Sequence, residues 1–414
     1  MSKLKIFLIL IVASVLPLRF FFFYQNQAHY TDSQDINFET TLFSEPEIFS
    51  NYQVLSANLG TIDKILIRTN LYPKFHYQDT LRISGKMKFK TLKNTKTIIT
   101  IYFPRIEVVK KDKNFLLALA NSIRQKVILL FSKTLPEPSS SLILGIVFGI
   151  KDLPKDFDNN LRISGVLHVV AASGMNISMI GAFSSSIFAF FLKRQIALVA
   201  TILVIIFYAI LSGLEPSIIR ASIMGILVFT SQILGKQNLA SYGLFLAGFV
   251  MLYFNPLLIF DVGFQLSFLA TLGLLYLRPI FAANKKVEKI IKKSIIGEDI
   301  TTTIIAQFAT LPILLSNFGT YSIWSIVANA LVLWSILPLM VIGGVSAMVG
   351  LILEPIGRLI LYLSIPLLFY FQKVVEVFGQ TEEIIRLNQF PWQFAVGYYA
   401  LFVALIGFKR NIKL

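Results

Sequence analysis

Apolar residues form long, nearly continuous runs over the C-terminal part of the chain, from residue 163 onward. An α-helix needs about 20 mostly apolar residues to cross the hydrocarbon core of a bilayer. The pattern predicts ten candidate spans, with Pro338 dividing one long run in two: 163–192, 195–213, 216–234, 239–254, 257–277, 300–317, 322–337, 338–353, 357–379 and 392–408. With a further apolar run near the N-terminus, we expect about eleven transmembrane helices.

That N-terminal run begins after Lys3 and Lys5. A cleaved signal peptide has the same charged start and apolar centre. This run lacks a small-residue cleavage site, however, and continues through Arg19 and four phenylalanines. We therefore predict an uncleaved first transmembrane helix at 1–27.

Residues 28–113 alternate between short β-rich stretches and turn residues, which is typical of an all-β domain. The predicted stretches are Thr40–Phe43, Tyr52–Ala57, Lys64–Thr69, Leu81–Lys90 and Thr97–Val109. About five strands in a segment of this length favour a small Greek-key barrel of the OB type.

One of these strands separates its charges cleanly, because successive side chains of a strand point to opposite faces. One face carries Arg82, Ser84, Lys86, Lys88 and Lys90, and the other carries Ile83, Gly85, Met87 and Phe89. The basic face is either a solvated surface or a surface that follows the backbone of a nucleic acid strand.

Residues 114–160 differ from both neighbouring regions. The apolar helix predicted at 115–135 is interrupted by Arg124, Lys126 and Lys133, which favours an amphipathic helix at the membrane interface. The next apolar run, 139–150, is too short to cross a bilayer and indicates a re-entrant segment. Residues 161–414 then form the predicted polytopic domain.

Composition supports a membrane protein, since 55% of the 414 residues are hydrophobic and only 14% are charged. Soluble domains carry about 25% charged residues. The mean hydropathy of +0.71 excludes soluble enzymes, secreted modules and fibrous proteins.

The formal net charge is +16. Lys193-Arg194, Lys236 and Arg278–Lys293 fall at alternate ends of the predicted spans, as expected of cytoplasmic loops. This orientation places the β domain outside the membrane. It also places Lys409-Arg410 outside, which the positive-inside rule disfavours and which points to a miscounted span near the C-terminus. Binding to a polyanionic partner is the other explanation of this excess of basic residues.

The chain has no cysteine and three histidines, so disulfides and thiolate chemistry are excluded and we expect no metal and no cofactor. Polar groups within predicted spans are then the functional candidates. The first group is His168, Ser173, Gly174 and Asn176, which either lines a polar cavity or forms a small-residue packing face.

A second candidate is Arg220, one turn into a predicted helix, which either snorkels to the interface or faces inward. Asp261 and Gln265 are four residues apart and share one helical face, and we expect Asp261 to pair with Arg220. For Gln307 and Asn329, we expect structural hydrogen bonding.

In their order along the chain, these motifs resemble the ComEC-type competence family, the bacterial inner-membrane channels for DNA uptake. The matching segments are LILGIVFGIKDLP at 142–154, GVLHVVAASGMNIS at 165–178, PSIIRASIM at 216–224 and NPLLIFDVGFQLSFLATLGL at 255–274, followed by Gln307, Leu311-Pro312 and Asn329. The resemblance implies a channel in the bacterial cytoplasmic membrane that conducts single-stranded DNA during natural transformation. The polar residues of the spans would line its path, namely His168, Ser173, Gly174, Asn176, Arg220, Asp261, Gln265, Gln307 and Asn329. The basic β domain would receive the strand outside.

Two departures from the family pattern change what the resemblance implies. A second histidine usually occupies the place of Asn176, so a role that needs that imidazole does not carry over. Many members also continue into a metallo-β-lactamase-like domain, whereas this sequence ends at Leu414. We therefore expect a channel and not an enzyme, with a separate nuclease.

The resemblance also implies partners. They are single-stranded DNA, membrane lipids, a DNA receptor outside the cell and, because no Walker A motif is present, a cytoplasmic helicase-like ATPase. The oligomeric state stays open.

Two other functions remain as alternatives. A small-solute secondary transporter would show inverted repeats, and none is visible in the sequence. An intramembrane serine hydrolase would use Ser173 as nucleophile, but His168 lies five residues away on a different helical face.

Overall fold

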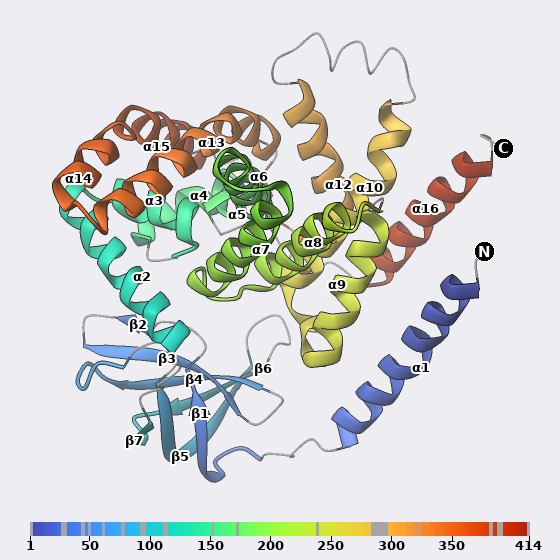
Figure 1. Cartoon of the computed structure of the whole chain (residues 1–414). Helices are drawn as coiled ribbons and strands as arrows, with labels where there is room; N and C mark the ends of the chain where they lie inside the picture. The colour runs from blue at the N-terminus through green and yellow to red at the C-terminus, as the bar shows by residue number, and fades with distance from the viewer. Residues whose placement is uncertain are drawn as a thin grey trace. The chain divides into compact units, whose positions relative to one another are not determined.

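The computed structural model describes residues 3–25, 31–42, 46–48, 51–59, 63–75, 79–91, 97–110, 115–150, 153–170, 174–236, 240–282, 297–318, 320–322, 324–380, 384–386 and 392–411. The chain forms two compact units, a first unit of residues 1–123 with 252–257 and a second unit of residues 124–251 with 258–414. Strands dominate the first unit and helices the second (Figure 1).

Among its described residues, the first unit contains the N-terminal helix α1 (Lys3–Gln25) and seven strands. The strands are β1 (Asp35–Thr41), β2 (Glu47–Ile48), β3 (Tyr52–Leu59), β4 (Asp63–Asn70), β5 (Thr80–Thr91), β6 (Thr97–Tyr102) and β7 (Arg105–Lys110). The last stretch predicted from the sequence is therefore two strands. Phe103, with a φ of 48°, and Pro104 interrupt it.

These strands pair in the order β1-β5-β6-β4-β3-β2, with β7 also paired to β5. All described pairs in this sheet are antiparallel except β4 with β6, which run parallel. The long strand β5 lies between β1 on one side and β6 and β7 on the other.

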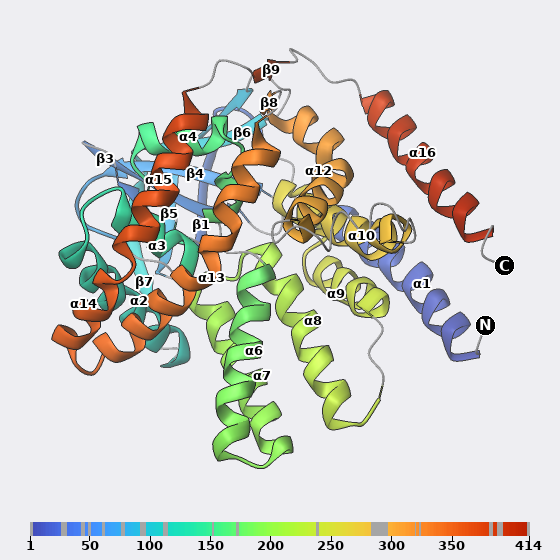
Figure 2. The same ribbon diagram turned by 90° about the horizontal axis from the view of Figure 1, so that it is seen from above.

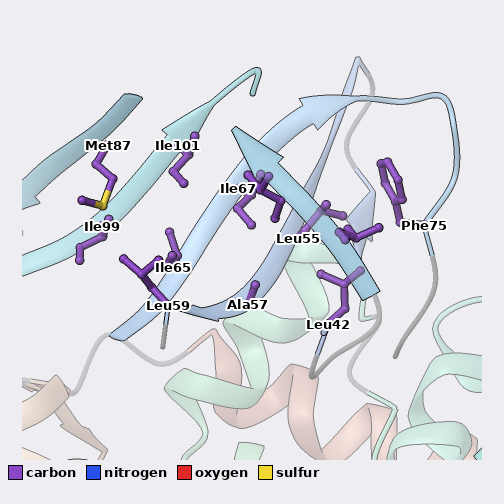
Figure 3. Packing of buried hydrophobic residues seen from close by; sticks show 12 residues of the cluster. Leu42, Leu55, Ala57, Leu59, Ile65, Ile67, Phe75, Met87, Ile99 and Ile101 are labelled. Atoms are coloured by element: carbon purple, nitrogen blue, oxygen red, sulfur yellow. The ribbon is translucent and has the colours of Figure 1, made fainter. Parts of the chain in front are cut away.

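The alternation predicted for β5 is confirmed. Ile83 and Met87 are fully buried, whereas Arg82, Lys86 and Lys88 are exposed. Inward side chains from the neighbouring strands complete an apolar core, which includes Leu55, Ile65, Ile67, Ile99 and Ile101 (Figure 3). The inward positions are mostly apolar, with Thr40, Gln53 and Thr69 as buried polar exceptions towards the strand ends.

The remaining described elements lie wholly or partly in the second unit. Three of them cross the boundary between the units: α9 and η1 each include part of residues 252–257 of the first unit, and α2 begins in the first unit. The elements are α2 (Phe115–Thr134), α3 (Ser139–Phe148), α4 (Lys155–Ile163), α5 (Leu167–Val170), α6 (Gly174–Phe191), α7 (Arg194–Leu211), α8 (Pro216–Ile233), α9 (Ala240–Phe254), the 3₁₀ helix η1 (Pro256–Phe260), α10 (Val262–Ala282), α12 (Gly297–Phe318), β8 (Thr320–Ser322), α13 (Ser325–Gly350), α14 (Glu354–Tyr362), α15 (Ile365–Gly379), β9 (Ile384–Arg386) and α16 (Trp392–Asn411).

Four helical segments of the described chain are long and apolar enough to cross a membrane. They are Leu167–Phe191, Arg194–Leu211, Pro216–Ile233 and Ser325–Gly350. The pair α14 and α15, bent by 48° at its break, gives a fifth if it counts as one span. The chain therefore has several membrane-capable helices.

Two predicted boundaries are wrong. The run at 322–353 is not divided at Pro338, because α13 continues through this proline over 26 residues. Membrane helices tolerate proline where neighbouring groups satisfy the freed backbone. The predicted span 357–379 is instead two helices that meet at an angle.

Small residues allow the helices of the second unit to pack closely. A Cβ added at Gly273 of α10 would lie 2.6 Å from the Cβ of Ala309 on α12. The helices α6, α7 and α8 form one packed group, whose shared core includes Ile177, Ile205 and Ile218 (Figure 2). These contacts fix the helices that carry the candidate polar residues.

Two tyrosines of α16 donate to backbone carbonyls of α12, and one of them compensates for a proline. Pro312 lacks an N–H, so the carbonyl of Phe308 loses its helical donor. The hydroxyl of Tyr398 donates to that carbonyl at 2.7 Å, and the hydroxyl of Tyr399 donates to the carbonyl of Ala309 at 3.1 Å. The carbonyl of Phe308, which would otherwise lack a donor, is thereby paired.

Candidate functional site

Four polar residues from three helices converge on Gly165, which lies two residues before α5. The side chain of Asn329 on α13 donates to the carbonyls of Ser325, at 2.6 Å, and Gly165, at 3.4 Å. Gln307 on α12 donates to the hydroxyl of Ser325 at 3.1 Å. His168 on α5 hydrogen-bonds the backbone of Gly165. We call these five residues the Gly165 cluster. Gln307 and Asn329 thus both make hydrogen bonds within the cluster.

Gly165 makes this convergence possible for two reasons. Its φ of +73° lies in the left-handed region, which L side chains rarely adopt. A Cβ at this position would also lie 2.5 Å from the Cβ of Ser325. The chain can therefore approach the start of α13 only because residue 165 has no side chain.

His168 differs from the other members of the cluster in its surroundings. Ser325 and Asn329 are buried, with 3% and 0% of their surface exposed. The side chain of His168 is instead exposed.

Arg220 lies at a second junction, between α6, α8 and α10. Only 9% of its surface is exposed. One guanidinium nitrogen, Nη1, donates to the carbonyl of Ser267 and, at 2.6 Å, to the hydroxyl of Thr271. Its Nε is buried without a hydrogen-bond partner among the described residues. We call Gly174, Arg220, Ser267 and Thr271 the Arg220 cluster.

The first residue of α6, Gly174, provides the space for this guanidinium. A Cβ at Gly174 would lie 2.8 Å from Nη2 of Arg220. The small residue predicted as part of a polar cavity or packing face thus lies directly against the buried cation.

The expected ion pair between Arg220 and Asp261 is not formed. Asp261 precedes α10, and its Oδ1 accepts the backbone N–H of Phe264 at 2.8 Å. This is an N-cap, the role that aspartate performs at helix starts. Gln265 donates to the carbonyl of Ile259 at 2.7 Å. Both side chains therefore hold the turn between η1 and α10.

Asn176 is part of a buried hydrogen-bond network around the short helix α3. Its Nδ2 donates to the carbonyl of Ile146 at 2.8 Å and to the hydroxyl of Tyr208 at 3.2 Å. That hydroxyl in turn donates to the carbonyl of Val147 at 2.7 Å. Since the last carbonyls of a helix have no helical donors, Asn176 and Tyr208 satisfy the end of α3.

The basic face of β5 divides into two parts. Arg82 pairs with Glu39 of β1, its Nε donating at 3.1 Å, and Lys86 lies opposite Asp35 of the same strand. Lys88 instead lies over the ring of Tyr102, with its Nζ 6.0 Å from the ring centroid. In the register of β5 with β6, Lys88 and Lys90 lie opposite Thr100 and Ile98, although Asp32 accepts the backbone N–H of the intervening Phe89 at 2.9 Å.

Two predicted site residues fall outside what the structure describes, namely Ser173 as a whole and Lys90 in its side chain. Other residues were missed by the sequence analysis, among them Tyr208, Ser267, Thr271 and Ser325. Hydroxyl-bearing residues are common in membrane helices, and no spacing rule distinguishes those that meet a distant partner. Across the described ranges, no three His, Asp or Glu side chains group as metal ligands do.

Comparisons with known proteins agree with the resemblance of the motifs. A model of the family described as "Competence protein" matches residues 146–411. Over 215 residues the chain is 28% identical to "ComE operon protein 3" of Bacillus subtilis (strain 168), covering 51% of this chain and 26% of that protein. No solved structure gives a significant match.

A second relative, named "Uncharacterized protein", comes from Aquifex aeolicus (strain VF5). It is 24% identical over 265 residues, which cover 62% of this chain and 61% of the relative. The chain thus spans less than two thirds of either relative. The family match extends over both polar clusters and more than half of the sequence, and the chain therefore belongs to the competence protein family.

Proposed function

We propose that the chain is a transmembrane channel that conducts single-stranded DNA across the bacterial cytoplasmic membrane during natural transformation. The buried guanidinium of Arg220, whose Nε has no hydrogen-bond partner among the described residues, carries this proposal. A polar group in such a position is expected where a membrane protein encloses a hydrophilic path. Membership of the competence protein family supports DNA as the transported molecule.

Within this path, we assign DNA contact to His168 and Arg220. Arg220 has no carboxylate partner among the described residues, and its Nε is unpaired. A guanidinium suits phosphate oxygens because its donors form a planar fork. Gly165, Gly174 and Asn329 then position these two side chains, and Gln307 supports Asn329 through Ser325.

We further propose that the strands of the first unit form an OB-type barrel outside the membrane. A single parallel pair, β4 with β6, within an otherwise antiparallel Greek-key order supports this fold. In addition, β1 lies beside β3, as closure of such a barrel requires.

For the transmembrane topology, we propose ten crossings instead of eleven, because α13 is one helix where two spans were predicted. An even number returns the C-terminus to the side of the N-terminus. Lys409-Arg410 then lies in the cytoplasm with Lys3 and Lys5, as the positive-inside rule expects. The corrected count removes the conflict that eleven spans create.

Transport in this account needs partners. We propose a DNA receptor outside the cell, a separate nuclease that leaves a single strand, and a cytoplasmic helicase-like ATPase that pulls it. Membrane lipids cover the exposed apolar side chains of the helices, such as Phe190, Leu203 and Leu359.

Internalisation of labelled DNA in a host without a paralogue tests the channel. Deletion of the gene is expected to reduce protected cytoplasmic label to background, and the wild-type gene is expected to restore it. Uptake that persists after deletion would overturn the channel and favour a small-solute transporter.

A further inference from the structure

Aromatic and basic side chains alternate on one outward face of the first unit. Arg68 on β4 and Tyr102 on β6 are paired in register, and the isoleucines beside them point inward. The guanidinium of Arg68 stacks on the ring of Tyr52 on β3, with its Cζ 3.6 Å from the ring centroid. Lys88 on β5 reaches the other side of Tyr102. Four neighbouring strands therefore contribute to one continuous row.

Phe103 extends this row at the end of β6. Its φ of 48° is unusual for a residue with a large side chain. The backbone N–H of Phe103 donates to the carbonyl of Arg68 at 2.7 Å, which holds the turn in place. As a result, the rings of Tyr102 and Phe103 are 43% and 53% exposed. Aromatic rings in a strained turn at the surface favour a binding role over a packing role.

Arg68 is held in place but is not neutralised. Its guanidinium lies over Tyr52 and 5.7 Å from the centroid of Phe103. Its Nε is buried and has no hydrogen-bond partner among the described residues. Arg82 and Arg105 on nearby strands are instead paired with Glu39 and Glu107. The half-buried guanidinium of Arg68 therefore has no carboxylate partner among the described residues.

We propose that Tyr52, Arg68, Lys88, Tyr102 and Phe103, the aromatic-basic row, bind single-stranded DNA. Bases stack on the exposed rings of Tyr102 and Phe103, and phosphates contact Arg68 and Lys88. A double helix fits this surface poorly, because its base faces are already stacked. Stacking on aromatic rings together with a cationic track is the mode by which proteins bind single strands without sequence preference. The choice of ligand rests on the proposed channel function.

Binding of a fluorescein-labelled oligothymidylate to the full chain in detergent, followed by fluorescence anisotropy, tests the row. Replacing both Tyr102 and Phe103 with leucine is expected to weaken binding about tenfold or more. The conservative pair Tyr102→Phe and Phe103→Tyr keeps both rings and is expected to retain the affinity. Thermal unfolding of each variant separates lost stacking from lost folding.

The contact of Arg68 with phosphate is tested by the salt dependence of oligonucleotide binding. Arg68→Gln is expected to reduce the slope of log affinity against log salt by about 0.7, the value for one phosphate contact on a single strand. Arg105→Gln is the control, since Arg105 is an exposed arginine of the same unit that is paired with Glu107. An unchanged slope in Arg68→Gln, or an equal change in both variants, would overturn the assignment of Arg68.

Failure of the row and failure of the channel give different results. If deletion abolishes DNA internalisation but the leucine variant binds oligothymidylate like the wild type, the row is wrong and the channel stands. The row is also overturned if the folded wild-type chain does not bind the oligonucleotide. If internalisation is independent of the gene while binding requires Tyr102 and Phe103, the channel fails and the row stands.

Discussion

Replacing Arg220 with methionine is expected to reduce DNA internalisation to the level of a deletion strain while leaving the folded protein at least as stable. The guanidinium is buried, and its Nε has no partner among the described residues. Exchange of buried charged groups for apolar ones is often neutral or stabilising by about 1–4 kcal/mol. Ser267 and Thr271 remain paired without Arg220, because the hydroxyl of Thr271 donates to the carbonyl of Ser267 at 2.9 Å.

The measurement combines internalisation of labelled DNA with thermal unfolding of the purified variant. Arg358→Met is the matched control, since Arg358 also has a buried, unpaired Nε but forms an ion pair with Glu354. We expect this control to leave internalisation unchanged. If Arg220→Met unfolds the protein, or if uptake survives in a folded variant, Arg220 is a structural residue and does not contact DNA.

Replacing Gly165 with alanine is expected to destabilise the helical unit by about 2–5 kcal/mol. A left-handed backbone costs an L residue roughly 1–2 kcal/mol, and overpacking costs typically about 1–3 kcal/mol. Both terms apply at Gly165, which has a φ of +73° and would place a Cβ 2.5 Å from that of Ser325. Unfolding of the purified protein by a denaturing detergent measures the change.

Gly235→Ala separates the cost of the left-handed backbone from the cost of overpacking. Gly235 has a φ of +64°, but nothing lies within 4 Å of an added Cβ, so we expect only the backbone cost of roughly 1–2 kcal/mol. Adding Ser325→Gly to Gly165→Ala should recover part of the loss by removing the clash. Equal effects of the two alanine variants would show that the contact with Ser325 does not constrain the protein.

The architecture follows largely from apolar periodicity. The strand alternation of β5 is visible in the sequence, because a face with Ile83 and Met87 can only be buried. The division of the membrane region was harder to predict. Pro338 is a helix breaker by intrinsic propensity, yet α13 passes through it, since packing and the lipid environment outweigh that propensity.

The sequence analysis identified several residues of the candidate site but not the groups that they contact. Arg220 was identified because a charge within an apolar run is costly. Its pairing with Asp261 was wrong, since Asp261 satisfies the start of its own helix, a local need that competes with any distant partner. Tyr102 and Arg68 were missed because they come from different strands, and only the parallel register of β4 and β6 brings them together.

The most direct test of DNA passage uses the absence of cysteine from the sequence. In a His168→Cys variant that still internalises DNA, a water-soluble thiol reagent is expected to modify the new side chain. A DNA molecule stalled by a bulky end is expected to protect it. Modification of Ile352→Cys, at an exposed apolar position away from the clusters, is expected to be independent of DNA. Equal modification of His168→Cys with and without stalled DNA would contradict a DNA path along His168.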